Sequence, residues 1–194
     1  MTPPRARGQR AGLDRETVLA AARDLLARDG LDALTMRALA DRLGVRPNTL
    51  YSHVPSKTAL VDELLDDVLG GIPAPEDPRP EQGVRELMTA TYRVLLEHAE
   101  LVPLYLSRQG ARGPQAQRLG EIMLDLLAKG GVHGEQAVEA RRVLIVYTIG
   151  FAAFNPGEGA VVPQEHIARN FALGLDWLLT GILGAGMDLP PPPA

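Results

Sequence analysis

Residues 35–54 (TMRALADRLGVRPNTLYSHV) constrain the fold of this chain more than any other segment. Their pattern predicts two short helices joined by a tight turn, with Ala40 and Gly44 where the helices pass closest. The inner face is apolar and comprises Leu39, Leu43, Val45 and Leu50. The outer face of the second helix is polar and comprises Asn48, Thr49, Tyr51, Ser52 and His53. A short helix of this kind is typical of helix-turn-helix proteins that read the DNA major groove.

Helix start and stop signals surround this motif. Asp14, Thr35 and Ser56 are good N-cap residues and predict the starts of a first, a second and a fourth helix. Gly30 and Gly44 predict the ends of the first two, because glycine readily adopts the left-handed conformation that terminates a helix. A third helix is expected over about residues 46–53, with proline tolerated in its first turn.

The remainder of the chain also has helical spacing. Residues 70–80 (GGIPAPEDPRP) hold four prolines and two glycines, so no helix crosses them and we expect a linker there. Beyond it the apolar periodicity predicts helices at about residues 82–98, 103–109, 114–129, 135–154 and 164–184. The sequence therefore predicts an all-α fold.

Charge is unevenly distributed along the chain. Residues 1–57 hold ten Lys/Arg and six Asp/Glu, a net charge of +4, whereas residues 58–194 hold ten and eighteen, a net charge of −8. This asymmetry is expected if only the first part binds nucleic acid, although chance clustering of arginine would produce the same count. There is no cysteine for a disulfide or a thiolate metal site. No apolar run reaches the ~18–20 residues that span a bilayer, and no secretory signal is visible, so we expect a cytoplasmic protein without a membrane partner.

The second half of the helix at 135–154 is almost wholly apolar. A helix that is apolar all round must be covered all round, and a partner subunit is the simplest cover. A two-fold four-helix bundle built with the last helix satisfies this requirement. The candidate interface residues are Ile149, Ala153, Phe171, Gly174 and Leu178. A fully buried central helix in a monomer is the alternative.

The N-terminal part resembles the tetracycline repressor (TetR) family of bacterial regulators. The resemblance rests on the run LGV–x3–TLYSHV–x2–K over residues 43–57, together with apolar positions from Val18 to Leu60. The segments LLEHAELVPLYLSR and FALGLDWLLTGI are similar to the C-terminal domain of the same family.

The resemblance implies a homodimer that binds a palindromic double-stranded DNA operator and represses transcription. A small-molecule effector in the C-terminal domain would release the DNA. An activator or a global DNA-binding regulator of the same fold is the alternative. We expect a flexible basic arm at residues 1–12, a helix-turn-helix domain at 13–70 and a linker at 71–81. A ligand-binding and dimerisation domain at 82–186 and a disordered tail at 187–194 would follow.

The resemblance also assigns roles to single residues. The DNA-binding set is Arg37, Arg46, Pro47, Asn48, Thr49, Tyr51, Ser52, His53 and Lys57. Candidate pocket residues are Met88, Thr91, Tyr92, Leu95, Tyr105, Met123, Thr148, Phe151 and Asn155, for each of which ordinary core packing is the alternative. Pro73 and Tyr105 stand where the founding member has the histidines that hold its metal–tetracycline chelate, so a magnesium–tetracycline effector is not expected.

Catalytic motifs are absent from the sequence. The four histidines are scattered, with no HxxxH pair and no carboxylate at metal-ligand spacing. No G-x-S-x-G, P-loop or G-x-G-x-x-G motif occurs, and no repeat of about 30–40 residues indicates a solenoid interaction module. We therefore expect no enzymatic activity, no cofactor and no metal site.

Overall fold

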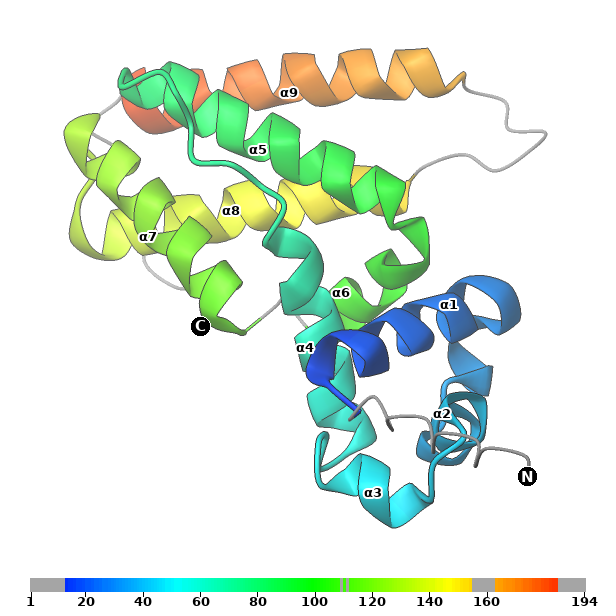
Figure 1. The fold of residues 1–194 in the computed structure, drawn as a ribbon. Coiled ribbons are helices and arrows are strands. Elements are labelled where there is room, and N and C mark those ends of the chain that lie inside the picture. Colours follow the sequence, from blue (N-terminus) through cyan, green and yellow to red (C-terminus); the bar gives the residue numbers. More distant parts are fainter. Residues whose placement is uncertain (1–12, 109, 111, 155–162, 185–194) are drawn as a thin grey trace, which may run out of the picture. The chain divides into compact units, whose positions relative to one another are not determined.

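A computed structural model describes residues 13–108, 110, 112–154 and 163–184 (Figure 1). Within these residues the chain forms α-helices and one short 3-10 helix and contains no strand, which confirms the all-α prediction. The α-helices are α1 (Arg15–Ala33), α2 (Met36–Leu43), α3 (Pro47–Tyr51), α4 (Lys57–Leu69), α5 (Pro80–Glu97), α6 (Val102–Arg108), α7 (Pro114–Lys129), α8 (Gly134–Ala153) and α9 (Gln164–Gly184). The predicted arm at 1–12, tail at 187–194 and pocket residue Asn155 lie outside the described residues.

The three expected caps of the N-terminal helices are present. Each is a side-chain oxygen that accepts a hydrogen bond from a backbone amide three residues later: Asp14 from Thr17 at 2.7 Å, Thr35 from Ala38 at 3.1 Å and Ser56 from Ala59 at 3.0 Å. These bonds satisfy amides that have no partner inside the helix. The caps explain why the helices begin where the sequence predicts.

The two predicted stop glycines have positive φ angles. Gly44 follows α2 with φ 65° and ψ 28°, which is the left-handed conformation of a helix end. Gly30 has φ 77° inside α1, so the regular helix ends there and a short irregular turn continues to Ala33. α1 therefore extends beyond the predicted end at residue 29 only through this kinked turn.

The chain divides into two compact units, one ending at Leu60 and the other starting at Val61. In the first unit α2 packs against both α1 and α3. Leu39 and Ala40 of α2 and Leu50 of α3 are fully buried, as the motif predicts. Arg42 pairs with Asp24 at 2.8 Å and links α2 to α1.

The second unit is a bundle built around α5. This helix contacts α7, α8 and α9, and α8 also packs against α6, α7 and α9 (Figure 1). The boundary between the units lies inside α4, earlier than the expected boundary after residue 70, because the later part of α4 bonds to α6 and α7.

Residues 70–79 contain no helix but are anchored to the second unit. Ile72 is 1% exposed, and its carbonyl accepts a hydrogen bond from Arg118 of α7 at 2.9 Å. The carboxylate of Glu86 on α5 accepts a hydrogen bond from the amide of Glu76 at 3.1 Å. The segment expected as a linker is therefore packed against α5 and α7.

None of the described helices combines the length and the apolar character needed to cross a lipid bilayer.

Candidate nucleic-acid interface and ligand cavity

Helix α3 exposes all but one of its side chains. Leu50 is completely buried and fixes the helix to its unit, whereas the side chains of Pro47, Asn48 and Thr49 are exposed and Tyr51 is 48% exposed. Pro47 occupies the first helical position, where its missing amide hydrogen costs nothing. Small polar groups and one phenol therefore lie together on a short convex element, a shape that fits a major groove.

Ser52 and His53 follow this helix and are both exposed. The Ser52 hydroxyl donates a hydrogen bond to the Thr49 carbonyl at 2.6 Å, which holds this side chain against the turn. The His53 amide donates a hydrogen bond to the Leu50 carbonyl at 2.9 Å, and the His53 side chain is exposed.

Three cations of the first unit point into solvent. Arg37, Arg46 and Lys57 are exposed, and none has a hydrogen bond or ion pair with a described residue. Arg42 differs, since Asp24 neutralises it. Lys57 is also the first residue of α4, where the helix dipole adds positive potential. Such cations are available for phosphate or base contacts.

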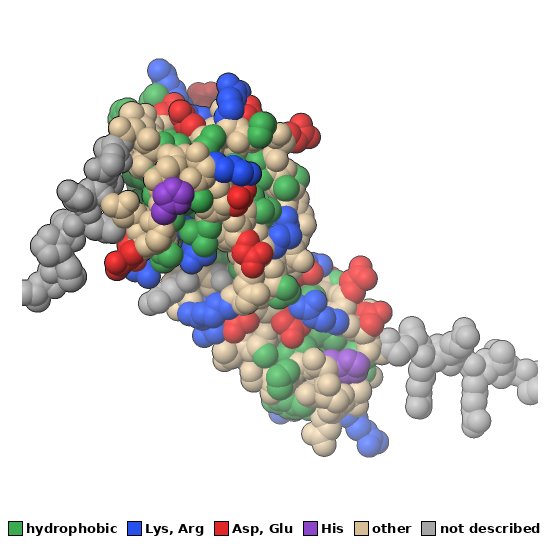
Figure 2. Space-filling view, turned by 90° about the vertical axis from the view of Figure 1, so that its left-hand side faces the viewer, with side chains coloured by type: hydrophobic (Ala, Val, Ile, Leu, Met, Phe, Trp, Pro, Cys, Tyr) green, Lys and Arg blue, Asp and Glu red, His purple; other side chains and the backbone are tan. Residues whose placement is uncertain are grey.

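Charged side chains of both signs are visible in Figure 2. On the face in Figure 2, basic and acidic side chains are interspersed over the visible surface. This face is therefore not uniformly basic.

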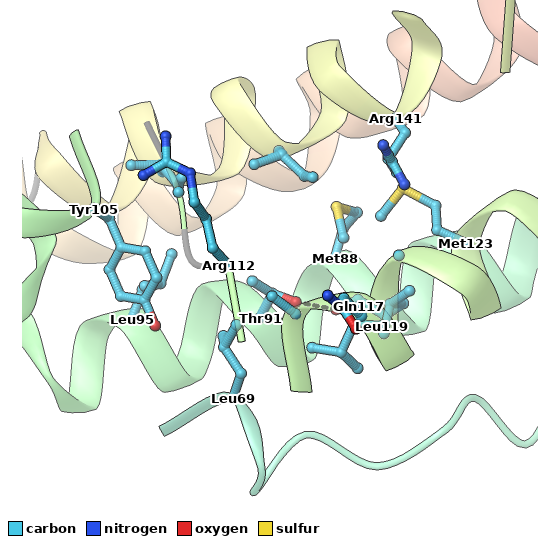
Figure 3. A pocket seen from close by; sticks show the side chains of 16 residues that line it. Leu69, Met88, Thr91, Leu95, Tyr105, Arg112, Gln117, Leu119, Met123 and Arg141 are labelled. Carbon is cyan, nitrogen blue, oxygen red and sulfur yellow. Dashed lines mark hydrogen bonds between the residues drawn. The ribbon is translucent and has the colours of Figure 1, made fainter. Parts of the chain in front are cut away.

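The second unit contains a cavity of about 300 Å³, at the lower end of the range for small-molecule sites. Its wall is mostly apolar and comes from α4 to α8 (Figure 3). The lining residues are Leu69, Leu87, Met88, Thr91, Leu95, Tyr105, Gly110, Arg112, Ala116, Gln117, Leu119, Gly120, Met123, Arg141, Ile145 and Ile149.

Five of the residues expected at a pocket lie in this wall. They come from α5, α6 and α7 and are Met88, Thr91, Leu95, Tyr105 and Met123. Three others, Tyr92, Thr148 and Phe151, are not among the lining residues and are reassigned to packing between helices. Thr148 is fully buried, and its hydroxyl donates to the Leu144 carbonyl at 2.8 Å.

An aromatic cluster joins α5, α8 and α9 and contains the other two reassigned residues. Tyr92 stacks on Phe171 with ring centroids 4.1 Å apart, and Phe151 meets Phe171 edge-on at 5.7 Å. The Tyr147 hydroxyl donates to the Phe171 carbonyl at 2.6 Å. Burial raises the pKa of Tyr147 to about 12. These rings pack the three helices together and are not part of the cavity lining.

Polar groups of the cavity escaped the sequence analysis. Arg112, Gln117 and Arg141 line it, but no periodic signal marks them, because their positions depend on how α7 and α8 pack. Arg108, a residue with the same chemistry, instead forms a two-pronged ion pair with Asp62 of α4, at 2.8 and 2.7 Å.

Two further bonds tie α4 to the cavity walls. The Tyr105 hydroxyl donates to the backbone carbonyl of Leu65 on α4. Burial, with the nearby Asp66 as a smaller cause, raises the pKa of this phenol. The carboxylate of Asp66 accepts hydrogen bonds from the first amides of α7, at Gln115 (3.1 Å) and Ala116 (2.9 Å). Asp66 thus caps α7 from another helix.

The expected dimer interface needs correction at three residues. Ile149 and Phe171 are 8% and 2% exposed and belong to the interior of their own unit. Gly174 lies against Tyr147, and a Cβ there would overlap the phenol, so its small size serves packing between α8 and α9. Ala153 is exposed and Leu178 half-buried, which leaves both accessible to a partner.

Comparison with known families settles the relationship of the chain. The description "Bacterial regulatory proteins, tetR family" matches residues 18–64, and "Tetracyclin repressor-like, C-terminal domain" matches residues 72–169. The chain belongs to the tetR family. The matched descriptions are those of regulatory proteins, in agreement with the resemblance found in the sequence.

Individual tetR family relatives are similar over much of the chain. An HTH-type transcriptional regulator of Saccharopolyspora erythraea is 34% identical over 140 residues, and the class A tetracycline repressor of Escherichia coli is 32% identical over 145 residues. Each alignment covers 71% of this chain and 59% or 65% of the relative. The chain therefore matches less than two thirds of the length of these two curated relatives.

Solved structures of tetR family relatives share the fold. ActR of Streptomyces coelicolor in complex with actinorhodin has a TM-score of 0.77 and 28% identity, covering 91% of this chain and 98% of that one. BioQ with its double-stranded DNA operator has a TM-score of 0.73 and 27% identity, covering 89% and 99%.

Proposed function

We propose that two copies of this chain bind a palindromic DNA operator through α2 and α3 and repress transcription from it. The observation that carries the proposal is the exposure pattern of α3, in which Leu50 is buried and Pro47, Asn48, Thr49 and Tyr51 are exposed. BioQ, whose structure contains its operator, supports it. A regulator that acts on bacterial DNA works in the cytoplasm.

An apolar stripe along α8 and α9 supports the dimer. Its members lie on α8 and α9, or directly after α8 in the case of Phe154, and are 41–75% exposed: Val143, Val146, Phe154, Leu173 and Trp177. Apolar side chains this exposed are stabilised when a second copy covers them. A two-fold axis would pair the stripe with itself as a four-helix bundle.

The cavity supports a small-molecule effector. Tyr105 and Leu69 line it, and Tyr105 is bonded to α4, the helix that starts with Lys57. A ligand that displaces the Tyr105 ring would therefore act directly on α4. ActR, solved with actinorhodin, supports control by a ligand.

Capture of genomic DNA tests the proposal. Purified protein is incubated with sheared DNA at ~0.15 M salt, and the bound fragments are sequenced. We expect a shared palindrome that is lost in Asn48→Ala and kept in Glu121→Ala, a change at an exposed residue of α7. Diffuse binding without a shared motif would overturn operator recognition. A motif located upstream of promoters whose output rises with the protein would favour the alternative, an activator.

A further inference from the structure

Arg141 is placed to act inside the cavity. It comes from α8 and lines the cavity together with Met123 of α7 (Figure 3). Gly120 of α7 makes the room, because a Cβ there would be 3.1 Å from Nη1 of Arg141. A charged group is therefore held against the helix backbone within a mostly apolar wall.

This guanidinium lacks the protein partner that several other arginines of the unit have. Arg108 pairs with Asp62, Arg142 pairs with Glu139, and Arg118 donates to two backbone carbonyls. Arg141 makes no ion pair or hydrogen bond with any described residue, and the described lining of the cavity contains no Asp or Glu. Arg141 is half-buried, and an unpaired charge that is partly withdrawn from water is stabilised by an anion, so the site favours a ligand that supplies one.

A second hollow of about 470 Å³ meets the first at this position. Both are lined by Tyr105, Gly110, Arg141, Ile145 and Ile149, and the second adds Arg142. An anion near Arg141 would thus lie where the two spaces join, with apolar wall on either side.

We infer that the effector is a compact apolar molecule with one anionic group, which Arg141 binds. This inference rests on the proposed function, since it names the class of ligand for the same cavity. The planar fork of a guanidinium binds a carboxylate or a sulfonate through two parallel hydrogen bonds, while the leucines and methionines of the wall hold the apolar body. Arg112, also in the lining, adds positive potential.

Two fluorescent probes with the same skeleton test the inference. 1-Anilinonaphthalene-8-sulfonate carries one negative charge, and N-phenyl-1-naphthylamine is its neutral counterpart. Dissociation constants are measured for both probes, without DNA, in the unaltered protein, in Arg141→Met and in Arg93→Met. Arg93 is an exposed arginine of α5 outside the cavity lining and controls for the loss of one positive charge.

We expect Arg141→Met to weaken sulfonate binding by about tenfold or more and neutral-probe binding by less than about twofold, because only the former loses a charge-assisted bond. Arg93→Met should leave both constants unchanged. The inference would be overturned if Arg141→Met changed the dissociation constants of the two probes by the same factor. It would also be overturned if Arg93→Met weakened sulfonate binding as much as Arg141→Met does.

A second variant keeps the charge and moves it. Gly120→Ala places a methyl group against the guanidinium of Arg141, so it should also reduce the preference for the sulfonate over the neutral probe. Gly150→Ala is the control, because its new methyl group meets open space and should leave this preference unchanged. The DNA capture experiment is independent of these titrations. If the protein selects an operator but does not prefer the sulfonate probe, only the proposed ligand class is refuted. If it prefers the sulfonate probe but selects no operator, only operator binding is refuted.

Discussion

The hydroxyl of Tyr105 donates to the backbone carbonyl of Leu65, so one wall of the cavity is bonded to α4. Tyr105→Phe removes this bond and keeps the ring. We expect a loss of about 0.5–1.5 kcal/mol in the free energy of unfolding, the usual contribution of one hydrogen bond. In operator-release titrations the variant should need more effector, because displacement of the ring no longer acts on α4. An unchanged effector dose would show that the signal bypasses this bond.

Asp66 is 3% exposed and holds the start of α7. Asp66→Asn replaces one acceptor oxygen by a donor facing backbone amides, so we expect a loss of about 1–3 kcal/mol in the free energy of unfolding, measured by urea denaturation. Asp125→Asn is the control, because it removes an exposed carboxylate from a surface pair with Lys129. Equal stability of the two variants would contradict the capping role.

Lys57 and Arg37 should affect DNA binding differently. Lys57→Gln should weaken binding to all sequences alike and reduce the slope of log affinity against log salt by about one, because a phosphate contact releases one counterion. Arg37→Ala, if the side chain reaches a base, should cost ~1–3 kcal/mol and relax the preference at one operator position. Binding curves at several salt concentrations separate the two. An unchanged slope for Lys57→Gln would exclude the phosphate contact.

Trp177 is 75% exposed and is the single tryptophan of the sequence. Because we place it in the interface, its emission should shift to longer wavelength when the protein is diluted below the dissociation constant of the dimer. Trp177→Glu should give a monomer in sedimentation and weak operator binding, since a charge in a desolvated interface is costly. A Trp177→Glu protein that sediments as a dimer would place the interface elsewhere.

Tyr147 makes stability depend on alkaline pH. Its folded pKa is about 12, above the usual value near 10, so the unfolded chain loses this proton first. The stabilisation is complete below pH 10 and is lost as the pH rises from about 10 to about 12. Denaturation at intervals across this range should show a steeper loss in the unaltered protein than in Tyr147→Phe. Parallel losses would assign the pH dependence to other groups.

Local signals carried most of the fold prediction. The caps at Thr35 and Ser56 and the turn at Gly44 depend on neighbours within three or four residues, which the sequence displays directly. The anchoring role of Leu50 follows from the same short-range pattern, because a five-residue helix has only one side to bury.

Long-range packing limited the prediction of the candidate site. The apolar second half of α8 did not reveal which side faces its own unit, so Ile149 was expected at the interface although it lines the cavity. Arg141 carried no sequence signal, since its role depends on Gly120 of another helix and on a cavity lining whose described residues include no Asp or Glu. Such features arise only once α7 and α8 are in contact.

The position of the unit boundary within α4 has a consequence for recombination. A chimaera joined after Leu69 would replace Asp62 and Asp66, whose carboxylates bond to α6 and α7, whereas a junction after Leu60 keeps both. A DNA-reading head from a relative is therefore expected to give a folded hybrid when the part of α4 from Val61 onward comes from the effector unit, or when the residues that bond to α6 and α7 are restored.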